Sequence, residues 1–145
     1  MNPAFRECLK KRKIIVFPRA RNLVQKELAT AAQDLAEARD RFEHGRYKYA
    51  TINAYYAVFH AARALIYAKG YRERSHFCLV VAFKTLFVDS RLLSARYARI
   101  IQNTMILREE ADYSGTFSEE GAAISILNAE EFIKAARRFL IPTTS

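Results

Sequence analysis

Apolar side chains recur every three or four residues along most of the chain, which is the spacing of amphipathic helices. The first run covers about residues 22–42 and places its apolar positions on one face: Val24, Leu28, Ala31, Leu35, Ala38 and Phe42. Similar runs predict further helices over about residues 49–70, 76–88, 93–111 and 117–140. Because short joints make successive helices antiparallel neighbours, we predict an all-α fold, an up-down antiparallel bundle of four to five helices.

Several residues indicate where these helices begin and end. Gly70 ends the second helix, and Ser75 closes the loop that follows and caps the third helix. Thr116, with Glu119 three positions later, resembles a capping box at the start of the last helix. Pro142 is expected to end that helix, because proline cannot continue it.

The helix over residues 49–70 carries three stripes of different character. One is a ridge of alanines at a strict four-three spacing, and a second is apolar and lies roughly opposite to it. The third stripe is polar and aromatic: Asn53, Tyr56, His60, Arg63 and Tyr67. In one interpretation these side chains hydrogen-bond to neighbouring helices, with Arg63 paired to an acidic residue. In the other they form a pocket in which aromatic rings stack on a base and Arg63 meets a phosphate.

Composition supports one globular domain and separates it from a basic N-terminal arm. The chain has 145 residues, of which 51% are apolar, and it has only four glycines and three prolines, too few for the turns of an all-β fold. Its net charge is +9, and residues 1–21 contribute +6 of it, with seven basic side chains and one acidic one. We therefore predict a basic arm over residues 1–21 and a helical bundle over residues 22–141. The arm either attracts phosphates or is a solvated leader, and residues 14–17 can pack as a short extended segment.

Cysteine content and hydropathy give expectations about location. Cys8 and Cys78 are too few for a disulfide framework and too isolated for a metal site, so a reducing cytoplasm is expected, with no metal or cofactor. No apolar run reaches the roughly 18–20 residues of a membrane span. No apolar segment near the N-terminus is long enough for a signal peptide. We expect a cytoplasmic protein without a membrane partner.

A longer pattern resembles a known family. The pattern runs "DL..A......G.Y..A...AYYAVFHAARALI...G" from Asp34 to Gly70, then His76, then "R..ADY" from Arg108 to Tyr113. It resembles the HEPN (higher eukaryotes and prokaryotes nucleotide-binding) family, in its small stand-alone prokaryotic branch. The resemblance implies a helical bundle that homodimerises and is often encoded beside a minimal nucleotidyltransferase. It also implies that active members are metal-independent ribonucleases, many of them toxins or defence effectors.

The catalytic motif of that family is an arginine followed four to six residues later by a histidine, and this chain departs from it. Arg108 has no histidine at that distance, and Tyr113 stands there instead. An unperturbed tyrosine, with a pKa near 10, is a poor general base at neutral pH but can donate a proton or a hydrogen bond. His76 follows Arg72 by four residues, in a different joint from the one that the family uses. Arg108, Tyr113 and His76 are therefore the candidate catalytic residues.

The candidate nucleotide-binding residues are Tyr56, His60, Arg63 and Asp112, the last of which can hold Arg108 in a bidentate pair or cap a helix. The leading hypothesis is a dimeric nucleotide- or RNA-binding protein that works with a nucleotidyltransferase partner in a toxin–antitoxin or defence setting. The first alternative is a metal-independent ribonuclease toxin that uses Arg108 with Tyr113 or His76. The second alternative is a non-catalytic helical interaction module.

Overall fold

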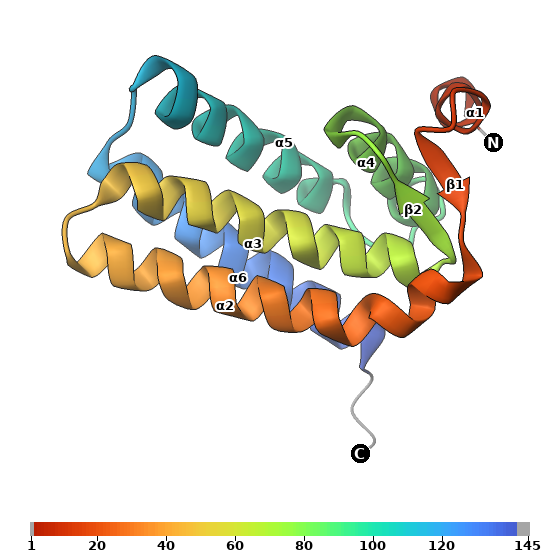
Figure 1. Ribbon diagram of the computed structural model, residues 1–145, viewed down its shortest axis with the longest axis horizontal. Helices are drawn as coiled ribbons and strands as arrows, with labels where there is room; N and C mark the ends of the chain where they lie inside the picture. Colours follow the sequence, from red (N-terminus) through yellow and green to blue (C-terminus); the bar gives the residue numbers. More distant parts are fainter. Residues whose placement is uncertain (1, 142–145) are drawn as a thin grey trace.

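The computed structural model describes residues 2–141, and it is an all-α bundle with one small sheet (Figure 1). Six α-helices account for most of the chain, which confirms the predicted fold class. The α-helices and strands are α1 (Pro3–Lys10), β1 (Ile14–Val16), α2 (Val24–Glu43), α3 (Tyr47–Ala68), β2 (Tyr71–Glu73), α4 (His76–Phe83), α5 (Ala95–Glu109) and α6 (Glu119–Leu140). Three shorter helical segments link them: η1 (Pro18–Leu23), which is 3₁₀, and η2 (Lys84–Val88) and η3 (Glu110–Ser114), which are π-helical.

Helix α3 is the central element of the bundle. It packs against α2, α6 and α5, and α4 lies beyond its C-terminal half (Figure 1). Its alanine ridge is fully buried from Ala50 to Ala64. Small side chains let neighbouring helices approach closely, so α3 can be enclosed on several sides at once. This position explains why α3 is apolar around most of its circumference.

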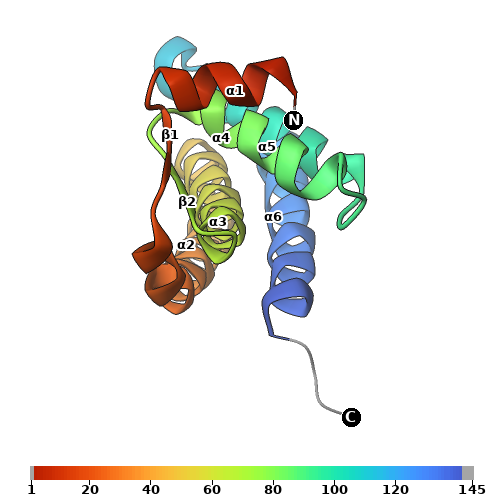
Figure 2. The same cartoon turned by 90° about the vertical axis from the view of Figure 1, so that its right-hand side faces the viewer.

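The N-terminal segment is folded against the bundle and is not a free, solvated arm. Helix α1 lies against α4, and β1 pairs antiparallel with β2, with Ile14 opposite Glu73 and Val16 opposite Tyr71 (Figure 2). Phe5 and Ile14 are buried in the main core. The extended segment expected over residues 14–17 is therefore present in part as β1, but it needs the partner strand β2.

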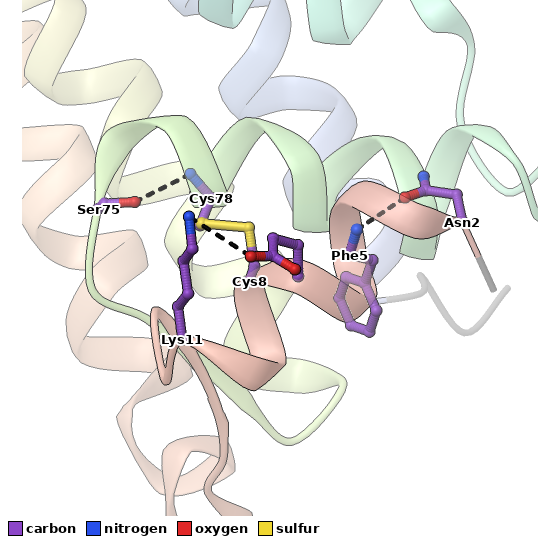
Figure 3. Close-up of a disulfide and its surroundings, with 7 residues drawn as sticks. Asn2, Phe5, Cys8, Lys11, Ser75 and Cys78 are labelled. Carbon is purple, nitrogen blue, oxygen red and sulfur yellow. Dashed lines mark hydrogen bonds and ion pairs between the residues drawn. A yellow bond between two sulfur atoms is a disulfide. The ribbon is translucent and has the colours of Figure 1, made fainter.

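The two cysteines form a disulfide, which corrects the expectation drawn from their number. Cys8 of α1 bonds to Cys78 of α4, with their Cα atoms 6.0 Å apart (Figure 3). This distance is within the range that a disulfide spans. The cysteines are 70 residues apart in sequence, so only the packing of α1 on α4 brings them together.

The helix ends agree with the sequence in part. The Ser75 side chain caps α4 by accepting a hydrogen bond from the Cys78 backbone N–H, as predicted. The loop expected after Gly70 instead contains strand β2. The predicted capping box at Thr116 is wrong, because the Ser118 side chain caps α6 and accepts a hydrogen bond from the Gly121 backbone N–H. The role predicted for Pro142 lies outside the described residues. Within residues 2–141, none of the helices is both long and apolar enough to cross a bilayer.

Candidate functional site

The polar stripe of α3 is divided between two separate clusters. His60 and Arg63 face carboxylates on α2 and β2, whereas Tyr56 faces the end of α5. The ring of Phe59 lies between the two groups, 5.3 Å from the ring of His60 and 6.3 Å from the ring of Tyr56, centre to centre. The stripe therefore does not form one pocket.

The first cluster is a network of ion pairs. His60 Nδ1 lies 2.6 Å from a carboxylate oxygen of Glu27, and Arg63 donates from Nε and Nη2 to the two carboxylate oxygens of Glu73, at 2.7 and 3.2 Å. Glu73 is only 3% exposed. This geometry supports the structural interpretation of the stripe, with Arg63 paired to an acidic residue. Nucleotide binding by His60 and Arg63 stays a prediction, and neither side chain is part of the second cluster.

The second cluster is centred on Arg108 in the last turn of α5. The Arg108 side chain is 13% exposed, and its Nη2 donates to the Tyr56 hydroxyl at 2.9 Å. Its guanidinium lies 5.4–5.6 Å from the ring centres of Tyr55, Tyr56 and Tyr113, which is close enough for cation–π attraction. Aromatic rings therefore surround much of a nearly buried positive charge.

The π-helical segment η3 places two further residues beside this guanidinium. A π turn is wider than an α turn, so the residues four and five positions after Arg108 both lie next to it. Asp112 Oδ2 is 3.5 Å from Arg108 Nη2, a single contact and not the bidentate pair that was considered. The Tyr113 ring is 76% exposed and covers the outer side of the cluster. Within the described chain, the buried Nε of Arg108 has no hydrogen-bond partner.

His76 joins the cluster from the first position of α4. Its Nδ1 lies 2.8 Å from the hydroxyl oxygen of Tyr55, and which of the two atoms donates depends on the tautomer of the imidazole. Burial lowers the pKa of His76 from its ordinary value of 6.5, and the positive charge of Arg108 lowers it further. Burial also raises the pKa of Tyr55 far above its ordinary value. At neutral pH the site therefore holds a neutral imidazole and a neutral phenol next to a fixed positive charge.

A cavity of about 480 Å³ opens beside this cluster, between the start of α1 and helices α4 and α5. His76 and Glu109 line its end nearest Arg108, and Phe77, Lys84 and Met105 line the rest. Its volume is within the range of small-molecule sites. Among residues 2–141 there is no group of three or more His, Cys, Asp or Glu side chains arranged to hold a metal ion.

The structure thus brings together five of the seven predicted site residues: Arg108, Tyr113, His76, Tyr56 and Asp112. Sequence reasoning missed Tyr55, which lies outside the polar and aromatic stripe of α3. Tyr55 and Tyr56 are adjacent, and adjacent side chains on a helix point about 100° apart. Both can therefore reach one guanidinium that lies between them, and the doubled tyrosine was the signal available in the sequence.

Comparison with known proteins now identifies the domain. The HEPN domain pattern matches residues 24–141, which is most of the chain. The chain belongs to the HEPN domain family. It is 33% identical over 121 residues to a Methanocaldococcus jannaschii protein named "Putative toxin MJ0605", covering 83% of this chain and 90% of that protein. It is also similar to an Archaeoglobus fulgidus protein named "UPF0332 protein", with 32% identity over 104 residues, 70% of this chain and 82% of that protein.

A Pyrococcus horikoshii protein named "UPF0332 protein PH1297" is 31% identical over 81 residues, 56% of this chain and 57% of that protein. All the residues of the Arg108 cluster lie inside the HEPN match. The match begins at Val24, so α1, β1 and η1 precede the family domain. This HEPN protein therefore carries its candidate site on the shared domain and an additional folded segment in front of it.

Proposed function

We propose that this HEPN protein binds RNA, with a phosphodiester group held at Arg108. The observation that carries the proposal is the environment of the Arg108 side chain: it is nearly buried among three tyrosine rings, and its buried Nε has no hydrogen-bond partner among residues 2–141. Its carboxylate contact is one oxygen of Asp112 at 3.5 Å. An arginine that served only to stabilise the fold would be expected to have a closer carboxylate, as Arg63 does.

The surroundings of Arg108 suit a nucleic acid better than a small anion alone. The exposed Tyr113 ring presents a face on which a base can stack, and such stacking tolerates any base. The cavity beside His76 offers an apolar wall for a second base or a ribose. The name of the Methanocaldococcus jannaschii relative supports a toxin setting for this activity.

The active form in this proposal is a homodimer with a nucleotidyltransferase partner. Exposed apolar side chains near the site support a dimer interface there: Ile106 and Phe117 are each at least half exposed. Pairing through this surface would place two Arg108 clusters near each other and remove apolar area from water. Sedimentation of the wild type and Ile106→Lys tests it, with a dimer expected for the first and a monomer for the second.

The decisive experiment compares Arg108→Ala with Arg99→Ala in binding to a labelled single-stranded RNA. Arg99 is an exposed arginine on the same helix and serves as the control for the loss of one positive charge. We expect Arg108→Ala to weaken binding at least tenfold more than Arg99→Ala, because charge-assisted contacts in a recessed site exceed those at the surface. Equal effects of the two substitutions would refute the assignment of Arg108 as the residue that holds the phosphodiester group.

Cleavage of the bound RNA is the second candidate function, and the position of His76 favours it. A neutral His76 can accept the proton of the ribose 2′-hydroxyl as that oxygen attacks phosphorus. The bond to the 5′-oxygen then breaks, and the Tyr113 hydroxyl supplies the proton of the leaving oxygen. Solvent water afterwards takes the extra proton from His76 and returns a proton to the Tyr113 phenolate, which restores both side chains. Arg108 stabilises the negative charge that develops on the phosphorane, and the products are a 2′,3′-cyclic phosphate and a 5′-hydroxyl.

This reaction is tested by incubating the RNA with the protein in the presence of a chelator. Cleavage that is lost in both Arg108→Ala and His76→Asn would support the enzyme. Binding without cleavage would leave the RNA-binding function. If the wild type neither binds nor cleaves RNA, the non-catalytic interaction module predicted from the sequence is supported instead.

A further inference from the structure

The outer face of the two-stranded sheet carries an unusual concentration of positive charge. Ile15 lies opposite Arg72, and Arg74 donates its backbone N–H to the Lys13 carbonyl at 2.7 Å, which continues the pairing by one residue. Opposite residues of a pair point to the same side, and sides alternate along a strand. Lys13, Arg72 and Arg74 therefore share one side, and all three are exposed. We call this side, together with Lys10, Lys11 and Arg12 of the preceding turn, the basic face.

In the part of the chain that the structure describes, acidic side chains leave most of this charge uncompensated. Glu73 lies between Arg72 and Arg74 in sequence, but it points inward and is paired with Arg63. Glu7 contacts Lys11 at 3.5 Å at the edge of the basic face. Like charges placed opposite each other, as at Lys13 and Arg74, destabilise a sheet. Repulsion between these charges lowers the stability of the sheet, and binding of an anionic partner would offset it.

The basic face is held in a defined position relative to the candidate site. Strand β2 runs toward the start of α4, and only Arg74 and Ser75 separate it from His76 (Figure 1). The Cys8–Cys78 disulfide ties α1 to α4 two residues beyond His76 (Figure 3). The charges at the end of α1, in the turn before β1 and on and just after β2 therefore belong to the same rigid structure as the Arg108 cluster.

We propose that the basic face binds the sugar–phosphate backbone of the same single-stranded RNA that reaches Arg108. This inference rests on the proposed function and adds a second contact region, built largely by the segment that precedes the HEPN match. RNA is favoured over an acidic peptide because one polymer with regularly spaced phosphates can occupy both the basic face and the recessed arginine. The guanidinium of Arg72 also lies 5.7 Å from the Phe17 ring centre, which adds an aromatic surface to the charges.

The test is the salt dependence of RNA binding by the triple variant Lys13→Gln, Arg72→Gln, Arg74→Gln. The matched control removes three exposed positive charges from α6, as Lys134→Gln, Arg137→Gln, Arg138→Gln. Figure 2 shows α6 on the opposite side of the molecule from β1. Each phosphate contact contributes about 0.7 to the slope of log affinity against log salt for a single strand, so we expect the first triple variant to lower the slope by about 2. The control is expected to leave the slope close to that of the wild type.

The outcomes separate this inference from the proposed function. Equal slopes for the two triple variants would refute RNA binding by the basic face, even if Arg108→Ala abolished binding or cleavage and so supported the Arg108 site. A lower slope in the first triple variant alone supports RNA binding by the basic face, even if Arg108→Ala had no effect and binding at Arg108 were refuted. Competition by poly-glutamate as effective as by unlabelled RNA would overturn the assignment to RNA. Circular dichroism of all variants confirms that they remain folded.

Discussion

The disulfide between Cys8 and Cys78 should be a large contributor to the stability of this protein. It closes a loop of 70 residues that contains β1, α2, α3 and β2. In the chain-entropy description, a crosslink across a loop of this length removes about 15 cal/mol/K from the unfolded chain, or about 4 kcal/mol at 25 °C. The stability of a domain is only about 5–15 kcal/mol, so this is a substantial share.

The assay is urea denaturation followed by circular dichroism, for the wild type with and without dithiothreitol and for the double variant Cys8→Ser, Cys78→Ser. We expect reduction to lower the free energy of unfolding by about 4 kcal/mol and the melting temperature by about 10 °C. The double variant should match the reduced wild type and should not respond to dithiothreitol. A thiol titration of the oxidised, unfolded protein should find no free thiol.

A loss below about 1 kcal/mol, with the disulfide shown to be intact before reduction, would refute the loop-closure argument. It would mean that the unfolded chain is already compact, or that α1 separates from α4 without unfolding the bundle. Free thiols in the oxidised protein would instead refute the pairing of the two cysteines. The two results are distinguishable because the titration does not depend on stability.

Three further predictions follow from the two clusters. Glu73→Gln should destabilise the fold by about 3 kcal/mol in urea denaturation, because it removes the closer of the two carboxylates that pair with the partly buried Arg63 and leaves Glu27 at 3.9 Å; a loss under about 1 kcal/mol would contradict this. Because folding lowers the pKa of His76, the unfolded chain binds more protons than the folded protein just below the ordinary value of 6.5. The free energy of unfolding should therefore decrease as the pH is lowered through this range, and less steeply in His76→Asn. Parallel pH profiles for both proteins would refute the assignment. Tyr56→Phe should weaken RNA binding about tenfold by removing the acceptor that orients Arg108, with little change in stability; unchanged affinity would show that this bond is not needed.

The sequence by itself determined the helices and the candidate residues. Amphipathic spacing is a local property, because residues three and four apart share a face whatever the rest of the chain does. For this reason the all-α class was predictable, as was the cap at Ser75. Arg108, Tyr113 and His76 could likewise be chosen as candidate residues, since that choice depends on residue type and on the resemblance to the HEPN pattern.

Only the tertiary structure decided which of these residues lie together. Tyr56, His76 and Arg108 lie on three helices, and their contacts depend on how α4 and α5 pack over α3. The same packing turned His60 and Arg63 toward Glu27 and Glu73, although they share a stripe with Tyr56. Strand pairing and disulfide formation likewise join segments far apart in the chain, and no local periodicity encodes them. For that physical reason, the segment predicted from sequence as a basic N-terminal arm is folded against the bundle and covalently bonded to α4.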